Sequence, residues 1–168
     1  MIQLIKYNKP TINGRIYKKG CFTNLDQVKN QFFIQKPSLD FKNYITVNLS
    51  HVIFVATLRE TKYGLYIKDL TFINTEENLN FLDVFENQKL GISLSSIGET
   101  TGNNHVVSSE IIKAELVINP DHANATHDFT FDTGIPRLIL EFTPLIDYDR
   151  YGEKYVSSKP HSFRNIFD

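Results

Sequence analysis

Residues 90–98 read L-G-I-S-L-S-S-I-G, from Leu90 to Gly98. Apolar residues alternate there with glycine and serine, and neighbouring residues of a strand point to opposite faces of a sheet. A strand over this stretch would therefore bury one face and turn its hydroxyls to the other. Such serines are ordinarily solvated on the outward face of an antiparallel sheet. They are also candidate nucleophiles where a base lies beside them.

Other segments of the chain follow the same alternation. Strands are expected at Ile45 to Leu58, at Leu65 to Phe72 after a turn at Tyr63-Gly64, and at Ser109 to Ile118. The first of these changes phase near Ser50-His51, which predicts a β-bulge. Together with the strand at residues 90–97 they need their apolar faces covered. One mostly antiparallel sheet that curls toward a barrel does this without leaving long flat edges.

Helices are expected to cover part of this sheet. A helix from Asn24 to Phe33 is predicted because Leu25, Val28 and Phe32 are spaced to share one face. A second, shorter helix is expected from Glu76 to Phe85, with Thr75 as its cap. The predicted fold class is therefore α+β, with a mostly antiparallel curled sheet or barrel, one or two packed helices and a C-terminal arm.

The C-terminal part of the chain has a different character. Short strands are expected at Phe129 to Phe131 and Leu138 to Phe142, so we divide the chain into a domain over 1–125 and a strand pair with an extended arm over 126–168. The arm lacks regular periodicity but is rich in aromatic residues and arginine, which are enriched at interface centres. Its candidate binding residues are Tyr148, Arg150, Tyr151, Tyr155, Phe163 and Phe167. The arm either docks on another polypeptide or folds back on its own domain.

Composition bounds the function classes. With 168 residues, 41% of them hydrophobic, and a net charge of -1, the chain fits one compact domain and lacks the basic character of a nucleic-acid-binding protein. No apolar run is long enough to span a bilayer, so no membrane association is expected. The lone cysteine, Cys21, cannot form an internal disulfide. His122 and His127 lack the spacing of a metal motif, so neither a metal nor another cofactor is expected.

Two further segments flank the serine-rich strand, and the order of the three segments is informative. Asn13-Gly14-Arg15-Ile16-Tyr17 precedes it, and Glu115-Leu116-Val117-Ile118-Asn119-Pro120 follows it. Over about positions 8 to 125 this order resembles the prohead (head maturation) proteases of tailed phages. That family carries N-G-R-x-Y-P, then N-H-P with the general-base histidine, then G-V-S-S-R-G-x-G with the nucleophile. The resemblance implies a fold of the prohead and herpesvirus protease type.

The resemblance assigns catalytic positions with departures from the family pattern. Ser93 takes the place of the nucleophile, while Ser96 replaces a glycine in the stretch that shapes the oxyanion site. Lys36 stands where the family has its histidine. A serine–lysine dyad would require desolvation to lower the pKa of Lys36 by several units. His51 is expected to be a packed or rim histidine, and His105 to lie solvated in a loop.

The missing histidine favours a non-catalytic structural component of a phage head, an auxiliary or decoration capsid protein. Its expected partners are the major capsid protein or other head proteins, with a homo-oligomer also possible. It would reside in the virion, and in the host cytoplasm during assembly. The alternative is an active prohead serine protease that cleaves scaffold and capsid precursors through Ser93 with Lys36 or another base. An unrelated binding module with a chance motif match also stays open.

Overall fold

The computed structural model describes residues 1–37, 46–85, 90–118 and 137–144. Within them the chain forms one seven-stranded sheet with the order β1-β4-β3-β2-β6-β5-β7. The strands are β1 (Ile2–Lys6), β2 (Phe32–Gln35), β3 (Val52–Thr61), β4 (Gly64–Phe72), β5 (Leu90–Thr100), β6 (Val106–Ile118) and β7 (Arg137–Pro144), and the helices are α1 (Leu25–Val28) and α2 (Glu76–Phe85). Neighbouring strands are antiparallel except for the parallel pair of β2 and β6.

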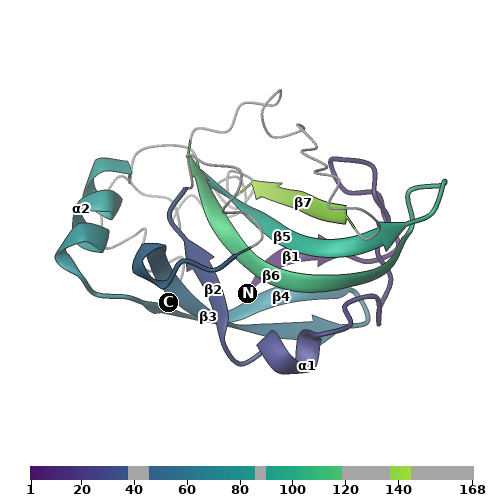
Figure 1. Ribbon diagram of the computed structural model, residues 1–168, viewed down its shortest axis with the longest axis horizontal. Coiled ribbons are helices and arrows are strands. Elements are labelled where there is room, and N and C mark those ends of the chain that lie inside the picture. The colour runs from purple at the N-terminus through teal and green to yellow at the C-terminus, as the bar shows by residue number, and fades with distance from the viewer. Residues whose placement is uncertain (38–45, 86–89, 119–136, 145–168) are drawn as a thin grey trace.

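The sheet curls until its two edge strands meet. Figure 1 shows β5 and β6 bending over β1 and β4, and β1 is in contact with β7. The Thr143 hydroxyl of β7 donates a hydrogen bond to the Leu4 carbonyl of β1 at 2.9 Å. The curled, mostly antiparallel sheet with few helices expected from the sequence is confirmed. A nearly closed barrel buries a single core, which includes Phe32, Ile34, Ile92 and Leu116.

The predicted helix from Asn24 to Phe33 is wrong. Only Leu25–Val28 is helical, and Phe32–Gln35 forms strand β2. The Asn24 side chain does not cap the helix. Instead it donates to the Ile111 carbonyl and accepts from the Ile111 N–H, both at 2.8 Å, as a strand neighbour would. Phe, Phe and Ile have high β-propensity, and β2 is hydrogen-bonded to both β3 and β6. These strand contacts stabilise the segment more than a longer helix would.

The predicted strand from Ile45 to Leu58 begins later than expected. Leu49–His51 is one turn of 3-10 helix, and β3 starts at Val52. The Asn48 side chain accepts from the Ser50 N–H at 3.1 Å and stabilises this turn. A register shift against β2 follows between Val52 and Phe54, close to the bulge expected near Ser50-His51. The strands expected at residues 65–72, 90–97, 109–118 and 138–142 and the helix after Thr75 are confirmed.

The hairpin of β3 and β4 depends on a glycine. The turn occupies Lys62 and Tyr63, one residue before the expected Tyr63-Gly64, and Gly64 is the first residue of β4. A Cβ at Gly64 would lie 2.1 Å from the carbonyl oxygen of Ile5, in the neighbouring strand β1. Glycine therefore allows β1 to approach β4 at this point.

Candidate functional site

Ser93 lies in the middle of β5, inside the sheet. It is paired with Glu115 of β6 on one side and with Phe142 of β7 on the other. Its side chain is half-buried, and Ser95, two residues further along the same face, is fully buried opposite Lys113. These hydroxyls are therefore not on an open solvated face, which was the ordinary interpretation of the alternating pattern.

The residues opposite these serines form a buried ion pair. The Lys113 ammonium lies 3.1 Å from the Glu115 carboxylate, and their side chains are 0% and 4% exposed. Removing two charges from water is costly, and the contact between the two opposite charges offsets part of that cost. The carboxylate paired in register with Ser93 is thus held by a cation from its own strand.

Gln35 completes a polar face over three adjacent strands. It is paired in register with Glu115, and its side-chain oxygen Oε1 accepts from the Asn48 N–H at 2.8 Å. Its Nε2 and the Ser95 Oγ are buried and make no hydrogen bond with the described residues. We call Gln35, Ser93, Ser95, Lys113 and Glu115 the β5–β6 polar face. It contains two serine hydroxyls, a glutamine amide, a glutamate and a lysine, but it contains no imidazole.

The structure does not bring Lys36 to Ser93. Lys36 follows β2, where its backbone N–H donates to the His51 carbonyl at 2.9 Å. Strand β6 lies between β2 and β5 in the sheet, which separates the two residues by about two strand spacings, or roughly 9–10 Å. Among the residues that the structure describes, no hydrogen bond joins the Ser93 side chain to a lysine or a histidine.

The other sequence-predicted residues fall in different places. His51 is exposed beside β3, and His105 is half-buried just before β6. The remaining candidates lie outside the described residues, namely His122, His127 and the arm residues Tyr148, Arg150, Tyr151, Tyr155, Phe163 and Phe167.

The segment expected to shape an oxyanion site is a strand paired on both sides, with one register shift against β6 between Ser95 and Ser96. From Gly91 to Gly98, β5 is paired with both β6 and β7, so its backbone N–H groups face neighbouring strands. A Cβ at Gly98 would lie 2.4 Å from the Ser108 carbonyl oxygen of β6. Gly98 therefore serves the close approach of two strands rather than an open loop around a developing charge.

The N-G-R-x-Y motif has a structural partner that the sequence did not indicate. Arg15 Nε donates to Glu141 Oε2 at 3.0 Å, and the Tyr17 hydroxyl donates to the same oxygen at 2.8 Å. The Thr11 hydroxyl donates to Oε1 at 2.9 Å, and Asn13 Nδ2 donates to it at 3.3 Å. We call Thr11, Asn13, Arg15, Tyr17 and Glu141 the Glu141 clasp. It fastens the N-terminal segment to β7.

A tight turn at Thr11 to Gly14 positions the side chains of the clasp. The Gly14 N–H donates to the Thr11 carbonyl at 2.8 Å, and Gly14 has a φ of 82°, which favours glycine. Asn13 Nδ2 and Arg15 Nη2 also donate to the Leu140 carbonyl, at 3.0 and 2.8 Å. The motif therefore binds both a side chain and a backbone carbonyl of an edge strand, which would otherwise present unpaired groups.

Burial dominates the electrostatics of the clasp. It raises the pKa of Glu141, an effect that the Arg15 guanidinium and the donated hydrogen bonds oppose. Burial, followed by the nearby Glu141 carboxylate, also raises the pKa of Tyr17 well above its ordinary value. A glutamate inside the apolar run Leu138 to Phe142 was the available sequence signal, because buried charges need partners.

Comparisons with models of known families, with curated proteins and with solved structures find no match for the chain. Neither helix in the described part of the chain is long and apolar enough to cross a membrane. Within the same residues, no group of three or more His, Cys, Asp or Glu side chains is placed to hold a metal ion.

Proposed function

We propose that the chain is a non-catalytic structural component of a phage head, an auxiliary or decoration capsid protein on a degenerate prohead-protease-like fold. The observation that carries the proposal is the setting of Ser93. This serine lies in a strand paired on both sides, opposite a glutamate that is already neutralised by a buried lysine. A serine nucleophile in that setting would lack a free base and free backbone N–H donors.

Two requirements of serine catalysis are poorly served there. The hydroxyl needs a neutral base to accept its proton. Lys113 is the amine nearest in strand register, but it is already engaged by the Glu115 carboxylate, which lies 3.1 Å away. The tetrahedral intermediate also needs free N–H donors, whereas those of β5 lie in the two ladders.

The phage-head assignment rests on the motif order and on what remains of the fold. The N-G-R-x-Y, G-I-S and E-L-V-I-N-P segments follow one another as in the prohead proteases. A curled sheet nearly closed into a barrel is compatible with a protease fold of the prohead and herpesvirus type. In this proposal the partners are the major capsid protein or other head proteins, and the arm residues between Tyr148 and Phe167 make the contact.

Precursor processing tests the loss of chemistry. The chain, or its Ser93→Ala variant, is produced together with the capsid and scaffold precursors of its phage, and cleavage is followed by mass spectrometry. We expect identical processing with both proteins. Cleavage that occurs with the wild type and disappears with Ser93→Ala would overturn the non-catalytic proposal.

Head binding tests the structural role separately. We expect the full chain to co-sediment with purified heads and a variant lacking Ser157 to Asp168 to bind more weakly. The thermal stability of that variant should stay close to that of the full chain. A large loss of stability with undiminished binding would show that the segment belongs to the domain and does not dock.

One observation favours the alternative of an active prohead serine protease. Lys113 is fully buried and lies diagonally across from Ser93, and a desolvated lysine is the kind that can act as a base. In that case Lys113, rather than Lys36, would pair with Ser93. Lys113→Met and Ser93→Ala would then each abolish precursor cleavage, while Lys36→Met would leave it intact. The structural proposal expects none of the three to alter processing.

A further inference from the structure

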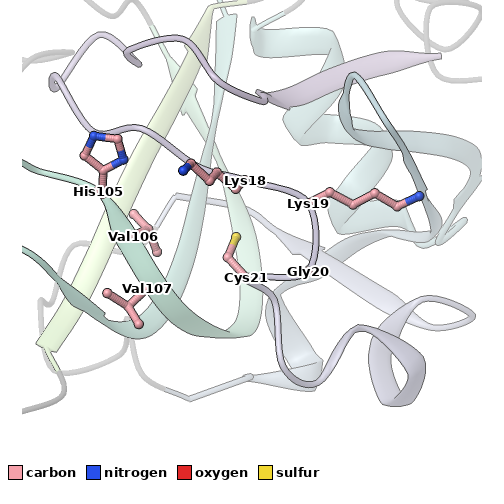
Figure 2. Close-up of a pocket in the computed structure, with 7 residues that line it drawn as sticks. All are labelled: Lys18, Lys19, Gly20, Cys21, His105, Val106 and Val107. Carbon is pink, nitrogen blue, oxygen red and sulfur yellow. The ribbon is translucent and has the colours of Figure 1, made fainter.

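A hollow lies between the start of β6 and the loop that precedes α1. Figure 2 shows its lining, with Lys18 reaching toward His105 and Lys19 directed away from it. Its volume is about 350 Å³, and its lining residues are Lys18, Lys19, Gly20, Cys21, His105, Val106 and Val107. None of them belongs to the β5–β6 polar face or to the Glu141 clasp.

Backbone hydrogen bonds fix both ends of the hollow. At one end the Val106 N–H donates to the Ile16 carbonyl at 2.9 Å, and at the other the Ser109 N–H donates to the Cys21 carbonyl at 2.8 Å. Between these two points the loop from Tyr17 to Gly20 is separated from β6, and Gly20, with a φ of 91°, lets the chain turn back to it. The hollow is therefore built into the fold, because its walls are joined on either side of the gap.

Two lysines and a histidine line the mouth of the hollow. No ion pair or side-chain hydrogen bond engages Lys18, Lys19 or His105 among the described residues. The acid joined to this loop is Glu60, which accepts from the Gly20 N–H at 3.3 Å and from the Tyr7 hydroxyl. Its charge opposes an anion near Gly20 and so favours a position between Lys18 and His105.

The inner wall of the hollow is apolar. Val106 is buried, and Val107 is 58% exposed. Cys21 is buried, and this burial raises the pKa of its thiol to about 11, so the sulfur is neutral at ordinary pH. A ligand that enters here meets cations at the mouth and uncharged, mostly apolar atoms on the wall.

We propose that this hollow binds a carboxylate attached to a small apolar group. The carboxylate lies between the Lys18 ammonium and the His105 ring, and the apolar group packs on Val106 and Val107. Such a group is carried by a short branched organic acid and by the C-terminal residue of a peptide. This site does not depend on the phage-head proposal, because it uses none of the same residues.

Titration with matched acids and amides tests the site on the full chain. The NMR signals of the His105 ring, the Gly20 amide and the valine methyls are followed while isovalerate, N-acetyl-valine or N-acetyl-valinamide is added. We expect saturable shifts with the two acids, at Kd values on the order of millimolar, and none with the amide. Tighter binding of N-acetyl-valine indicates a chain terminus as the source, and equal or tighter binding of isovalerate indicates a small organic acid.

Charge variants identify the cation responsible. Lys18→Gln should weaken N-acetyl-valine binding about fivefold, as expected for losing one exposed ionic contact. Lys18→Arg keeps the charge and should bind within about twofold of the wild type. Lys68→Gln, on the exposed side of β4, is the matched control and should change nothing. Equal shifts with acid and amide, no saturable shift, or equal weakening by Lys68→Gln would each overturn the proposal.

Discussion

Removing the cation of the Glu141 clasp should destabilise the protein more than any surface substitution. Arg15→Met takes the guanidinium from a carboxylate whose side chain is only 2% exposed. Breaking a buried pair by removing one partner costs about 3–5 kcal/mol, because it leaves an uncompensated buried charge. That is a large part of the 5–15 kcal/mol by which domains are usually stable. The urea midpoint should fall accordingly, with little change in the m-value.

A double-mutant cycle separates the ion pair from the rest of the clasp. Glu141→Met alone should also cost about 3–5 kcal/mol, since it breaks the buried ion pair and removes the acceptor of the Arg15 and Tyr17 hydrogen bonds. The double variant Arg15→Met/Glu141→Met removes both charges. It should cost only about 1–3 kcal/mol, the expected penalty for the Tyr17 hydroxyl left without its acceptor. The coupling energy between the two positions should therefore reach about 3 kcal/mol or more.

The matched control is Arg59→Met, which makes the same chemical change at an exposed position of β3. It should move the stability by no more than about 0.5 kcal/mol. Arg15→Lys keeps the charge but loses the planar guanidinium that reaches both Glu141 and the Leu140 carbonyl. Its loss of stability should lie between those of Arg15→Met and Arg59→Met. If Arg15→Met shifts the midpoint no further than Arg59→Met, the clasp does not stabilise the fold.

Two further predictions concern close packing and alkaline pH. Gly98→Ala should cost about 1–3 kcal/mol, because the new Cβ would lie 2.4 Å from the Ser108 carbonyl oxygen. Gly102→Ala, which meets nothing within 4 Å, should leave the thermal midpoint unchanged, and an equal loss in both variants would contradict this reasoning. Stability should also fall as the pH rises above about 9, because burial raises the pKa of Tyr7, Tyr17 and Cys21 in the folded chain. Their stabilisation is complete below the ordinary pKa values of 9.0 for Cys21 and 10.0 for the tyrosines. It is lost as the pH rises further, because the unfolded chain releases these protons first. Urea midpoints at successive pH values should decline less steeply for Cys21→Ala, and a flat profile for the wild type would contradict the expectation.

Period-two alternation was enough to predict the long strands. Leu90 to Ile97 and Leu65 to Phe72 have alternating apolar residues and are strands in the structure. The helix after Thr75 was equally readable, because the Thr75 hydroxyl accepts from the Asn78 N–H at 3.1 Å, as an N-cap should. These features are local, so the residues that determine them are neighbours in sequence.

The short elements could not be predicted because distant residues decide them. The apolar spacing from Leu25 to Phe32 fits a helix, yet the helix ends at Val28 and β2 begins at Phe32. The deciding contacts are with residues far along the chain, such as the two hydrogen bonds between Asn24 and Ile111. A pattern of apolar residues does not contain that information.

The same limit applies to the chemistry around Ser93. Alternation predicted a strand from Ser109 to Ile118, with Lys113 and Glu115 on the same face of it. In the structure Lys113, Ala114, Glu115 and Leu116 are all buried, so both faces of this stretch are covered. Lysine and glutamate two apart on a strand predict a solvated face unless burial is known. Their pairing in register with Ser95 and Ser93 became apparent only from the sheet.

The Glu141 clasp bears on how the N-G-R-x-Y motif should be interpreted. The motif carries part of the resemblance to prohead proteases, yet its side chains contact β7 where β7 meets β1. Ser93 lies in β5, the strand next to β7, and none of the clasp hydrogen bonds involves it. The motif therefore contributes to the stability of the sheet through contacts that do not involve Ser93. The two are separable by experiment: Arg15→Met should change the unfolding midpoint strongly, and Ser93→Ala should leave it nearly unchanged because its half-buried hydroxyl makes no hydrogen bond with the described residues.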